Sequence, residues 1–134
     1  MIGPWWGRYV GRRYDRTKAN CWTLIRDVYA DRLGIEMSDF SDVDPENTSA
    51  VARQMRREAR FWTSVDAPTA FDVVLMRHRD HSVPVHVGIA VNGVEMLHTT
   101  PATDCVLVRL SDVSVRSRIV GFRRHPDVCS RLLV

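Results

Sequence analysis

The chain has little that would mark a nucleic-acid-binding protein. Among its 134 residues Lys18 is the only lysine, and the net charge is a mild +3. A nucleic-acid binder is expected to carry a denser basic patch interleaved with aromatic residues. The nearest candidate is an arginine-rich segment with helical spacing, which we interpret as a solvated helix face: Arg53, Arg56, Arg57 and Arg60. We therefore expect no nucleic-acid partner.

Long hydrophobic runs are missing as well. No stretch approaches the roughly 18–20 apolar residues of a membrane span. Residues 1–15, MIGPWWGRYVGRRYD, lack the continuous apolar segment of a secretory signal peptide. We therefore expect neither a membrane span nor a signal peptide. A chain of 134 residues without repeats or long linkers fits one hydrophobic core, which predicts a single domain over residues 1–134.

Cysteine is scarce. Cys21, Cys105 and Cys129 are an odd number at wide spacings, which fits neither a disulfide framework nor a zinc site and suits a reducing compartment. Cys105 and Cys129 are interpreted as small apolar residues. The histidines of RHRDHSVP (residues 77–84) have no third ligand at a suitable spacing, so we predict a loop there. We expect no metal and no cofactor.

Three regions of different character follow one another along the chain. Residues 1–18 are aromatic and basic and predict an irregular arm, residues 19–62 predict a helical part, and residues 70–125 predict a β-sheet. The strand-like runs are short, apolar and separated by turn residues: FDVVLM, VHVGIAV, VEMLHT, VLVRL and RIVGFRR. Helices followed by strands indicate an α+β domain, with helices packed on a mostly antiparallel sheet.

A first helix is predicted over residues 21–33, where apolar residues recur at helical spacing. Asn20 is a good N-cap, and Gly34 is a good residue to follow the last turn. Cys21 would then begin the helix, where the helix dipole favours a thiolate. The segment DPE at residues 44–46 indicates the start of a second helix, with proline in its first turn.

The segment VHVGIAVNGVEMLHTT predicts a hairpin with a histidine on each strand. Asn92-Gly93 lies between the two runs, with His86 near the start of the first and His98 near the end of the second. A two-residue loop would point the histidines to opposite faces. We predict a three-residue loop over residues 91–93, with Gly93 left-handed. His86 then lies directly opposite His98, with Cβ atoms about 4.5–5.5 Å apart.

One cysteine and two histidines are the parts of a nucleophilic site. A thiol is a weak nucleophile at neutral pH and needs a general base, and a third polar group must hold that base in the right tautomer. His86 and His98 suit these two roles for Cys21. Backbone amides near the helix start suit stabilisation of the oxyanion.

With these residues in this order, the chain resembles the NlpC-type cell-wall peptidases, which are compact papain-like cysteine peptidases. The resemblance runs from about Trp5 to Arg124 and rests on the segments YVGRRYD, NCWTLIRDVYADRLGI, FDVVLM, HVGIAVNGVEMLH and IVGFRRH. It implies a compact papain-like fold, in which N-terminal helices pack on a mostly antiparallel sheet.

By this resemblance, the nucleophile is Cys21, the general base His86 and the orienting residue His98. Tyr14 would be a side-chain donor near the oxyanion hole, and Asn20 and Trp22, which flank the cysteine, would belong to the oxyanion and substrate site. Two features depart from the family. Asn20 stands where an aspartate is usual, and the arm after Tyr14 is short and lacks the usual glycine pair.

The resemblance also implies a substrate and a setting. Family members typically hydrolyse amide bonds in the peptide stems of bacterial peptidoglycan. An aromatic residue after the cysteine most resembles members encoded by tailed bacteriophages. Since no signal peptide is expected, we expect a phage tail tip or baseplate to carry the enzyme to the wall, which locates it in the virion tail. The alternatives are a catalytically silent structural tail-assembly protein and a different acyl-transfer or amidase reaction.

Overall fold

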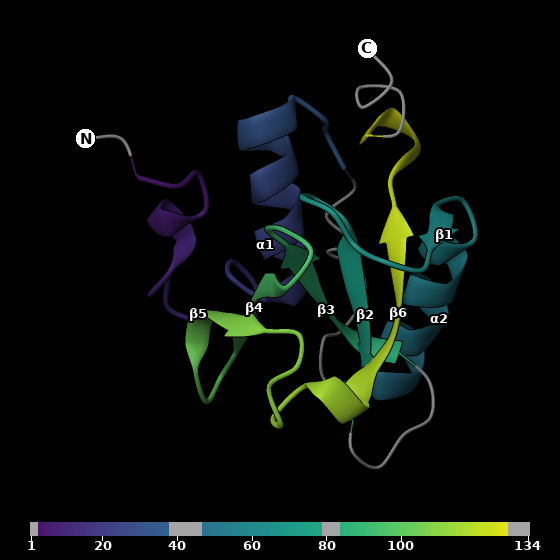
Figure 1. Ribbon diagram of the computed structural model, residues 1–134. Helices are drawn as coiled ribbons and strands as arrows, with labels where there is room; N and C mark the ends of the chain where they lie inside the picture. Colours follow the sequence, from purple (N-terminus) through teal and green to yellow (C-terminus); the bar gives the residue numbers. More distant parts are fainter. Residues whose placement is uncertain (1–2, 38–46, 79–83, 129–134) are drawn as a thin grey trace.

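A computed structural model describes residues 3–37, 47–78 and 84–128 of the chain (Figure 1). Helices come first and a six-stranded sheet follows, as the predicted α+β class requires. The helical elements are η1 (Gly7–Tyr9), α1 (Cys21–Val28), η2 (Tyr29–Leu33), α2 (Thr48–Ala59) and η3 (Arg116–Arg118). The strands are β1 (Thr63–Val65), β2 (Val73–Arg77), β3 (Pro84–Ala90), β4 (Glu95–Thr100), β5 (Asp104–Arg109) and β6 (Ile119–Arg124).

The first helix begins where the sequence predicted. The Asn20 side-chain oxygen accepts hydrogen bonds from the amides of Trp22 and Thr23, both at 3.0 Å, and the Thr23 hydroxyl accepts one from the Asn20 amide at 2.8 Å. This reciprocal capping box makes Cys21 the first helical residue. The helix continues through the π-helical turn η2 and ends at Gly34, whose φ of 65° is left-handed.

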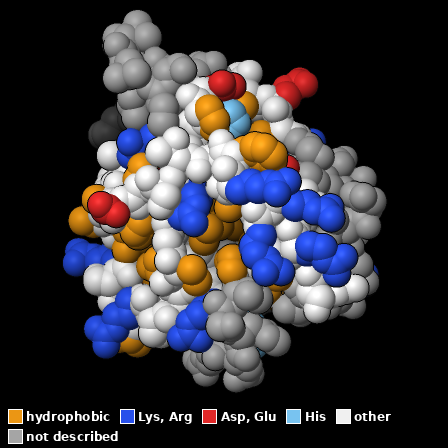
Figure 2. Space-filling model, turned by 90° about the vertical axis from the view of Figure 1, so that its right-hand side faces the viewer, with side chains coloured by type: hydrophobic (Ala, Val, Ile, Leu, Met, Phe, Trp, Pro, Cys, Tyr) orange, Lys and Arg blue, Asp and Glu red, His pale blue; other side chains and the backbone are white. Residues whose placement is uncertain are grey.

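The second helix, α2, begins at Thr48. Asn47 is its N-cap and accepts a hydrogen bond from the amide of Ala50 at 3.1 Å. The start predicted at residues 44–46 lies outside the described residues. The four arginines at positions 53, 56, 57 and 60 are exposed, which confirms the solvated helix face. Figure 2 looks onto the side where α2, β1 and β6 lie in Figure 1, and it shows basic side chains gathered around hydrophobic ones.

The sheet has the strand order β1-β6-β2-β3-β4-β5, and every neighbouring pair is antiparallel. Five strands coincide with the predicted runs, while β1 is an additional three-residue edge strand paired with β6. It escaped prediction because TSV is too short to show a periodic pattern. Among the residues described, no helix is long and apolar enough to cross a membrane.

Each face of the sheet has its own hydrophobic cluster. Both helices cover one face, where apolar residues of α1 and α2 pack with alternate residues of the strands: Leu24, Ile25, Val28, Met55, Val73, Leu75, Val87, Ile89 and Leu97. The segment between β5 and β6 covers the other face, where Val115 packs with Val74, Met76, Ala90 and Met96. The alternation of side chains along β2, β3 and β4 assigns each residue to one cluster.

The N-terminal arm is fastened along the edge of β5. The Gly11 amide donates to the Cys105 carbonyl at 2.8 Å, and the Cys105 amide donates to the Arg12 carbonyl at 2.9 Å. Further along, the Tyr14 amide donates to a carboxylate oxygen of Asp104 at 2.8 Å. These bonds bring Tyr14 toward the start of α1.

The β3–β4 hairpin has a three-residue loop, but the predicted position of that loop is wrong. The Val91 amide donates to the Glu95 carbonyl at 3.0 Å, so the loop spans residues 92–94 and not 91–93. The Asn92 side-chain oxygen accepts hydrogen bonds from the amides of Val94 and Glu95, each at 2.9 Å. An asparagine that closes the turn in this way makes a left-handed Gly93 unnecessary, and Gly93 does not adopt that conformation.

The register of the hairpin moves with its loop. Ala90 pairs with Met96, and continuing this register places Gly88 opposite His98. His86 is therefore the diagonal neighbour of His98, not its direct partner as the sequence predicted. A shift by two positions preserves the alternation of side chains, so both histidines still lie on the same face.

Candidate functional site

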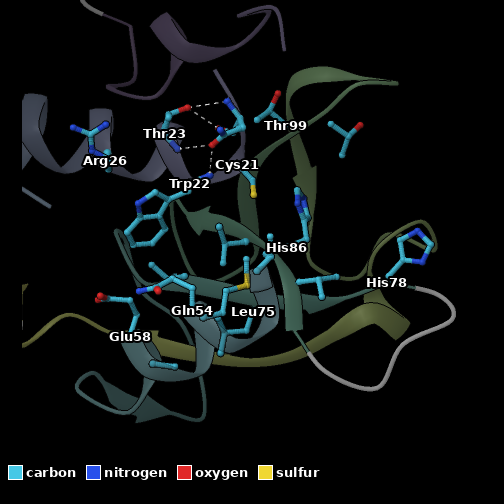
Figure 3. Close-up of a pocket in the computed structure, with 18 of the residues that line it drawn as sticks. Cys21, Trp22, Thr23, Arg26, Gln54, Glu58, Leu75, His78, His86 and Thr99 are labelled. Carbon is cyan, nitrogen blue, oxygen red and sulfur yellow. Dashed lines mark hydrogen bonds between the residues drawn. The ribbon is translucent and has the colours of Figure 1, made fainter. Parts of the chain in front are cut away.

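A cavity of about 870 Å³ lies between the start of α1, the α2 helix and the start of β3 (Figure 3). Five of the six residues singled out from the sequence line it: Tyr14, Asn20, Cys21, Trp22 and His86. The sixth, His98, is buried, with 5% of its surface exposed, and contacts His86. The fold thus brings together residues from the arm, a helix and two strands.

An interruption of the sheet gives Cys21 its place. Within the described residues, β3 and β4 pair at only two positions, although both strands continue beyond them. Amides alternate in direction along an antiparallel strand, and because the amide of Val91 points toward β4, that of Val87 does too. The Val87 amide donates to the Cys21 sulfur. The thiol thus occupies the position that a β4 carbonyl would fill in a continuous ladder.

This interruption also connects the two faces of the sheet. Cys21 packs with the cluster on the helix side, as does Val87. His86 alternates with Val87, and so it belongs to the opposite face together with His98. Because no strand pairing closes the sheet between them, Cys21 and His86 both line the same cavity. Figure 3 shows the Cys21 side chain and the His86 ring at the wall of this cavity. Our expectation of hydrogen-bond reach between these two groups stays a prediction.

The two histidines form a hydrogen-bonded pair. Nε2 of His86 lies 3.0 Å from Nδ1 of His98, and the rings meet edge to face at 72° with centroids 5.3 Å apart. Since Nε2 is engaged with His98, Nδ1 is the His86 nitrogen left to face the thiol. For Nδ1 to accept a proton, Nε2 must carry the ring hydrogen and donate it to His98. The pairing accommodates the tautomer that a general base needs, in which Nε2 of His86 donates to Nδ1 of His98.

Gly88 allows this close approach. A Cβ atom at this position would lie 2.9 Å from the Leu97 carbonyl oxygen, 2.9 Å from the Met96 sulfur and 3.3 Å from the Cβ of His98. The absence of a side chain lets β4 and the His98 ring lie directly against β3.

The Cys21 thiol is half-buried and protonated at rest. Burial raises its pKa above the usual value, and hydrogen bonds from the backbone amides of Val87, Trp22 and Cys21 itself oppose that rise without overcoming it. The sequence had favoured a thiolate because of the helix dipole. The structure corrects this, because desolvation outweighs the amides at the helix start.

Both histidines are neutral at neutral pH. Burial is the main cause that lowers the pKa of His86 to about 3, with further contributions from His98 and from the positive charge of Arg118. Burial likewise lowers the pKa of His98 to about 4, again with a contribution from Arg118. A neutral His86 is able to accept a proton, so the resting site is a thiol beside a base.

The other three predicted residues take distinct places. Asn20 uses its oxygen for the helix cap and donates its amide hydrogen to the Arg16 carbonyl at 2.9 Å. Trp22 is half-buried and lies on the α2 side of the cavity (Figure 3). Tyr14 lines the cavity with its backbone held by Asp104. The role of each in binding stays a prediction.

Arg118 and Thr99 are among the cavity residues that sequence reasoning missed. Arg118 reaches the histidines from the start of β6, and its Nε donates to the Arg77 carbonyl at 3.0 Å. Thr99 is 4% exposed, and its buried hydroxyl has no hydrogen-bond partner in the described part of the chain. Side chains alternate along a strand, so the predicted strand places Thr99 on the face of the sheet opposite to His98. Only the pairing of distant strands brings Arg118 close.

Metal-binding clusters of three or more suitable side chains do not occur within residues 3–37, 47–78 and 84–128. His78 is exposed at the cavity. Asp80, His81 and Cys129 lie outside the described residues. Cys105 is a buried free cysteine, as predicted, and burial raises its pKa to about 11.

Comparisons with known proteins agree with this architecture. The model of the NlpC/P60 family matches residues 6–124. A solved structure from Staphylococcus aureus subsp. aureus Mu50, described as similar to lipoprotein of the NLP/P60 family, superposes with a TM-score of 0.58 at 23% identity. That match covers 87% of this chain, which spans 37% of the length of the staphylococcal one. No curated protein matches the chain.

Proposed function

Because this chain belongs to the NlpC/P60 family, whose members are generally peptidoglycan-hydrolysing cysteine peptidases, we propose that it cleaves amide bonds in peptidoglycan stem peptides. In this proposal Cys21 is the nucleophile, His86 the general base and His98 the residue that orients it. The observation that carries the assignment is the 3.0 Å contact between the two histidines, at the wall of the cavity that Cys21 also lines.

The proposed reaction begins from the neutral pair. As the Cys21 sulfur attacks the carbonyl carbon of the scissile amide, the thiol proton passes to Nδ1 of His86. A bond forms between sulfur and carbon, and negative charge develops on the substrate oxygen. The helix cap engages the amides of the two residues after Cys21. The amide of Cys21 itself is therefore the donor at the helix start that suits the oxyanion.

Collapse of this intermediate completes the acylation. His86 returns the proton to the amide nitrogen as the carbon–nitrogen bond breaks, and the amine leaves while the acyl group stays on the sulfur. Water then attacks the thioester, with His86 again accepting a proton. The carbon–sulfur bond breaks, which releases a carboxylic acid and restores the thiol. Throughout, His98 accepts the hydrogen on Nε2 of His86 and stabilises the transient imidazolium.

Digestion of purified muropeptides tests the peptidase proposal. Wild type is expected to release fragments whose masses identify one cleaved amide, and Cys21→Ala is expected to release none. Cys105→Ala is the matched control, because Cys105 is also a free cysteine but is buried in the core away from the cavity lining. If wild type cleaves no stem chemistry, the catalytically silent structural protein becomes the better account.

We also propose that a phage tail tip or baseplate carries the enzyme and that it acts from the virion at the cell wall. The support is the Cys21-Trp22 pair, since an aromatic residue after the cysteine resembles members encoded by tailed phages. Mass spectrometry of purified virions from the encoding strain is expected to find the protein in the tail fraction. Its absence from purified tails would refute this carrier and leave the peptidase proposal intact.

A further inference from the structure

The α2 helix has two chemically different sides. One side lines the cavity with Val51, Gln54, Met55, Glu58 and Ala59. The other side carries four exposed arginines, at positions 53, 56, 57 and 60, which we call the arginine stripe. Their spacings of three and four residues place them in one row along the helix. The stripe therefore lies about one helix diameter, roughly 10 Å, from the cavity. Figure 2 shows basic side chains gathered on the side of the molecule where α2 lies.

The arginine stripe has no anionic partner within the part of the chain that the structure describes. The guanidinium of Arg60 lies 5.1 Å from the centre of the Phe61 ring, and none of the four arginines forms an ion pair with a described residue. Glu58, the one acidic residue of positions 48–60, lies on the cavity side of the helix. Four positive charges are thus gathered over roughly 10 Å of helix length.

Repulsion within the arginine stripe distinguishes it from a face that is merely solvated. Like charges three or four residues apart destabilise a helix, and the stripe contains four such pairs: 53–56, 53–57, 56–60 and 57–60. A solvated helix face usually alternates positive and negative charges instead. The helix dipole favours Arg56 and Arg57 in the last turn, but it does not account for Arg53. An anion bound from outside would relieve this repulsion.

We propose that the arginine stripe is a docking surface for polymeric peptidoglycan, bound through the carboxylates that its stem peptides repeat along the polymer. The proposal rests on the proposed peptidase function, because the polymer docked on one side of α2 is then the polymer whose stems enter the cavity on the other. Guanidinium groups form strong, charge-assisted hydrogen bonds with carboxylates. At the end of the stripe, the Phe61 ring is 67% exposed and offers an apolar contact to the sugar chain.

Docking of this kind acts on the polymer and not on its fragments. A row of four arginines engages several carboxylates at once, so that weak contacts combine into stable binding. Bound polymer holds further stems near the cavity, which raises their local concentration. A soluble muropeptide gains little of this advantage because it carries few carboxylates. The stripe is therefore expected to affect cleavage of intact sacculi and to leave cleavage of soluble fragments unchanged.

Co-sedimentation with purified sacculi tests the docking surface without requiring cleavage. The protein is the inactive Cys21→Ala variant, and the probes are sacculi freed of other wall polymers and the same sacculi with their carboxylates converted to neutral amides. Cys21→Ala is expected to bind the untreated sacculi roughly tenfold more tightly, with a difference that shrinks as salt is added. Replacing all four arginines of the stripe by glutamine is expected to weaken binding to untreated sacculi about tenfold.

A second quadruple variant removes the same charge elsewhere. Its four arginines are exposed and lie outside both the cavity lining and the stripe: Arg13→Gln, Arg32→Gln, Arg109→Gln and Arg116→Gln. This control is expected to bind untreated sacculi within about threefold of the parent. Circular dichroism and thermal unfolding verify the fold of each variant.

Three results would overturn the docking surface. The first is equal binding of the parent to untreated and amidated sacculi, and the second is unchanged binding by the stripe variant. The third is an equal loss in the control variant, which would mean that net charge alone decides binding. Tighter binding of the parent to duplex DNA or to anionic lipid vesicles than to untreated sacculi would assign the stripe to another partner and would also overturn the proposal.

Turnover separates the docking surface from the peptidase proposal. With Cys21 intact, the stripe variant is expected to cleave soluble muropeptides within about twofold of the wild-type rate and to release fragments from sacculi about tenfold more slowly. Equal losses on both substrates refute the docking surface alone. If neither substrate is cleaved while binding to sacculi depends on the stripe, the peptidase proposal fails and the docking surface stands.

Discussion

Gly88→Ala is expected to damage stability and activity together, because this position joins the hairpin to the histidine pair. The new methyl carbon would lie 2.9 Å from the Leu97 carbonyl oxygen and 2.9 Å from the Met96 sulfur. The oxygen belongs to the paired backbone of β4 and cannot move aside without displacing the strand. The Met96 sulfur belongs to a fully buried side chain, so it would have to repack within the core. Overpacking of this kind costs about 1–3 kcal/mol.

For a domain of this size, that cost corresponds to a fall in Tm of roughly 3–15 °C. Activity is expected to fall as well, because the methyl would lie 3.3 Å from the Cβ of His98 and push its ring away from His86. A displacement of about 1 Å at a catalytic group can cost about a hundredfold in rate. Urea unfolding measures the first effect, and kcat/KM on muropeptides measures the second.

Gly93→Ala is the control within the same hairpin. Its Cβ would meet only the Pro68 carbonyl oxygen, at an ordinary 3.5 Å, and its φ is not left-handed. The expected cost is below about 0.5 kcal/mol, with unchanged turnover. If Gly88→Ala unfolds as wild type does and retains full activity, the close approach of the two strands is not what positions His98.

Three further predictions concern the orienting residue, the buried ion pair and pH. His98→Leu is expected to lower kcat by about a hundredfold or more. His98→Gln keeps an oxygen that can accept the hydrogen on Nε2 of His86, so its kcat is expected to fall less. Equal losses in the two variants would contradict the orienting role proposed for His98. Arg124→Met leaves the fully buried carboxylate of Asp72 without the guanidinium that lies 2.8 Å away. In urea titrations the free energy of unfolding is expected to fall by about 3–5 kcal/mol and to recover when Asp72→Asn is added. Failure to recover would mean that lost packing, and not the unpaired charge, causes the destabilisation. Burial lowers the pKa of His86 to about 3 and that of His98 to about 4. Between those values and the unfolded pKa of about 6.5, the unfolded chain binds more protons than the folded one. The free energy of unfolding is therefore expected to fall with decreasing pH, by at most about 1.4 kcal/mol per pH unit for each histidine. The urea midpoint should therefore decrease more between pH 7 and pH 5 in wild type than in a His86→Gln/His98→Gln variant. Equal decreases in the two proteins would mean that other groups cause the pH dependence.

Local signals were sufficient for much of the fold. Asn20 marked the start of the first helix because capping depends on residues within one turn. The meeting of His86 and His98 followed from a hairpin, in which sequence separation translates directly into spatial proximity. These features are determined by neighbours along the chain or across one turn.

Other features depend on atoms that no local pattern describes. The loop position depended on whether the Asn92 side chain or a left-handed Gly93 would close the turn, and both choices fit the same residues. Arg118 reaches the site only because β6 inserts beside β2, far away in sequence. The protonated state of Cys21 follows from its burial, which is a property of the whole packed domain.

The short pairing between β3 and β4 has a consequence for engineering this domain. Extending that ladder would add backbone hydrogen bonds and make the sheet more regular, which ordinarily stabilises a domain. Here it would also take the Val87 amide from the Cys21 sulfur and close the passage to the histidines. Under the proposed function, greater stability and retained catalysis are therefore opposed at this one position. Substitutions meant to raise the Tm belong in the pairing of β2 with β6, where more regular strands leave Cys21 undisturbed.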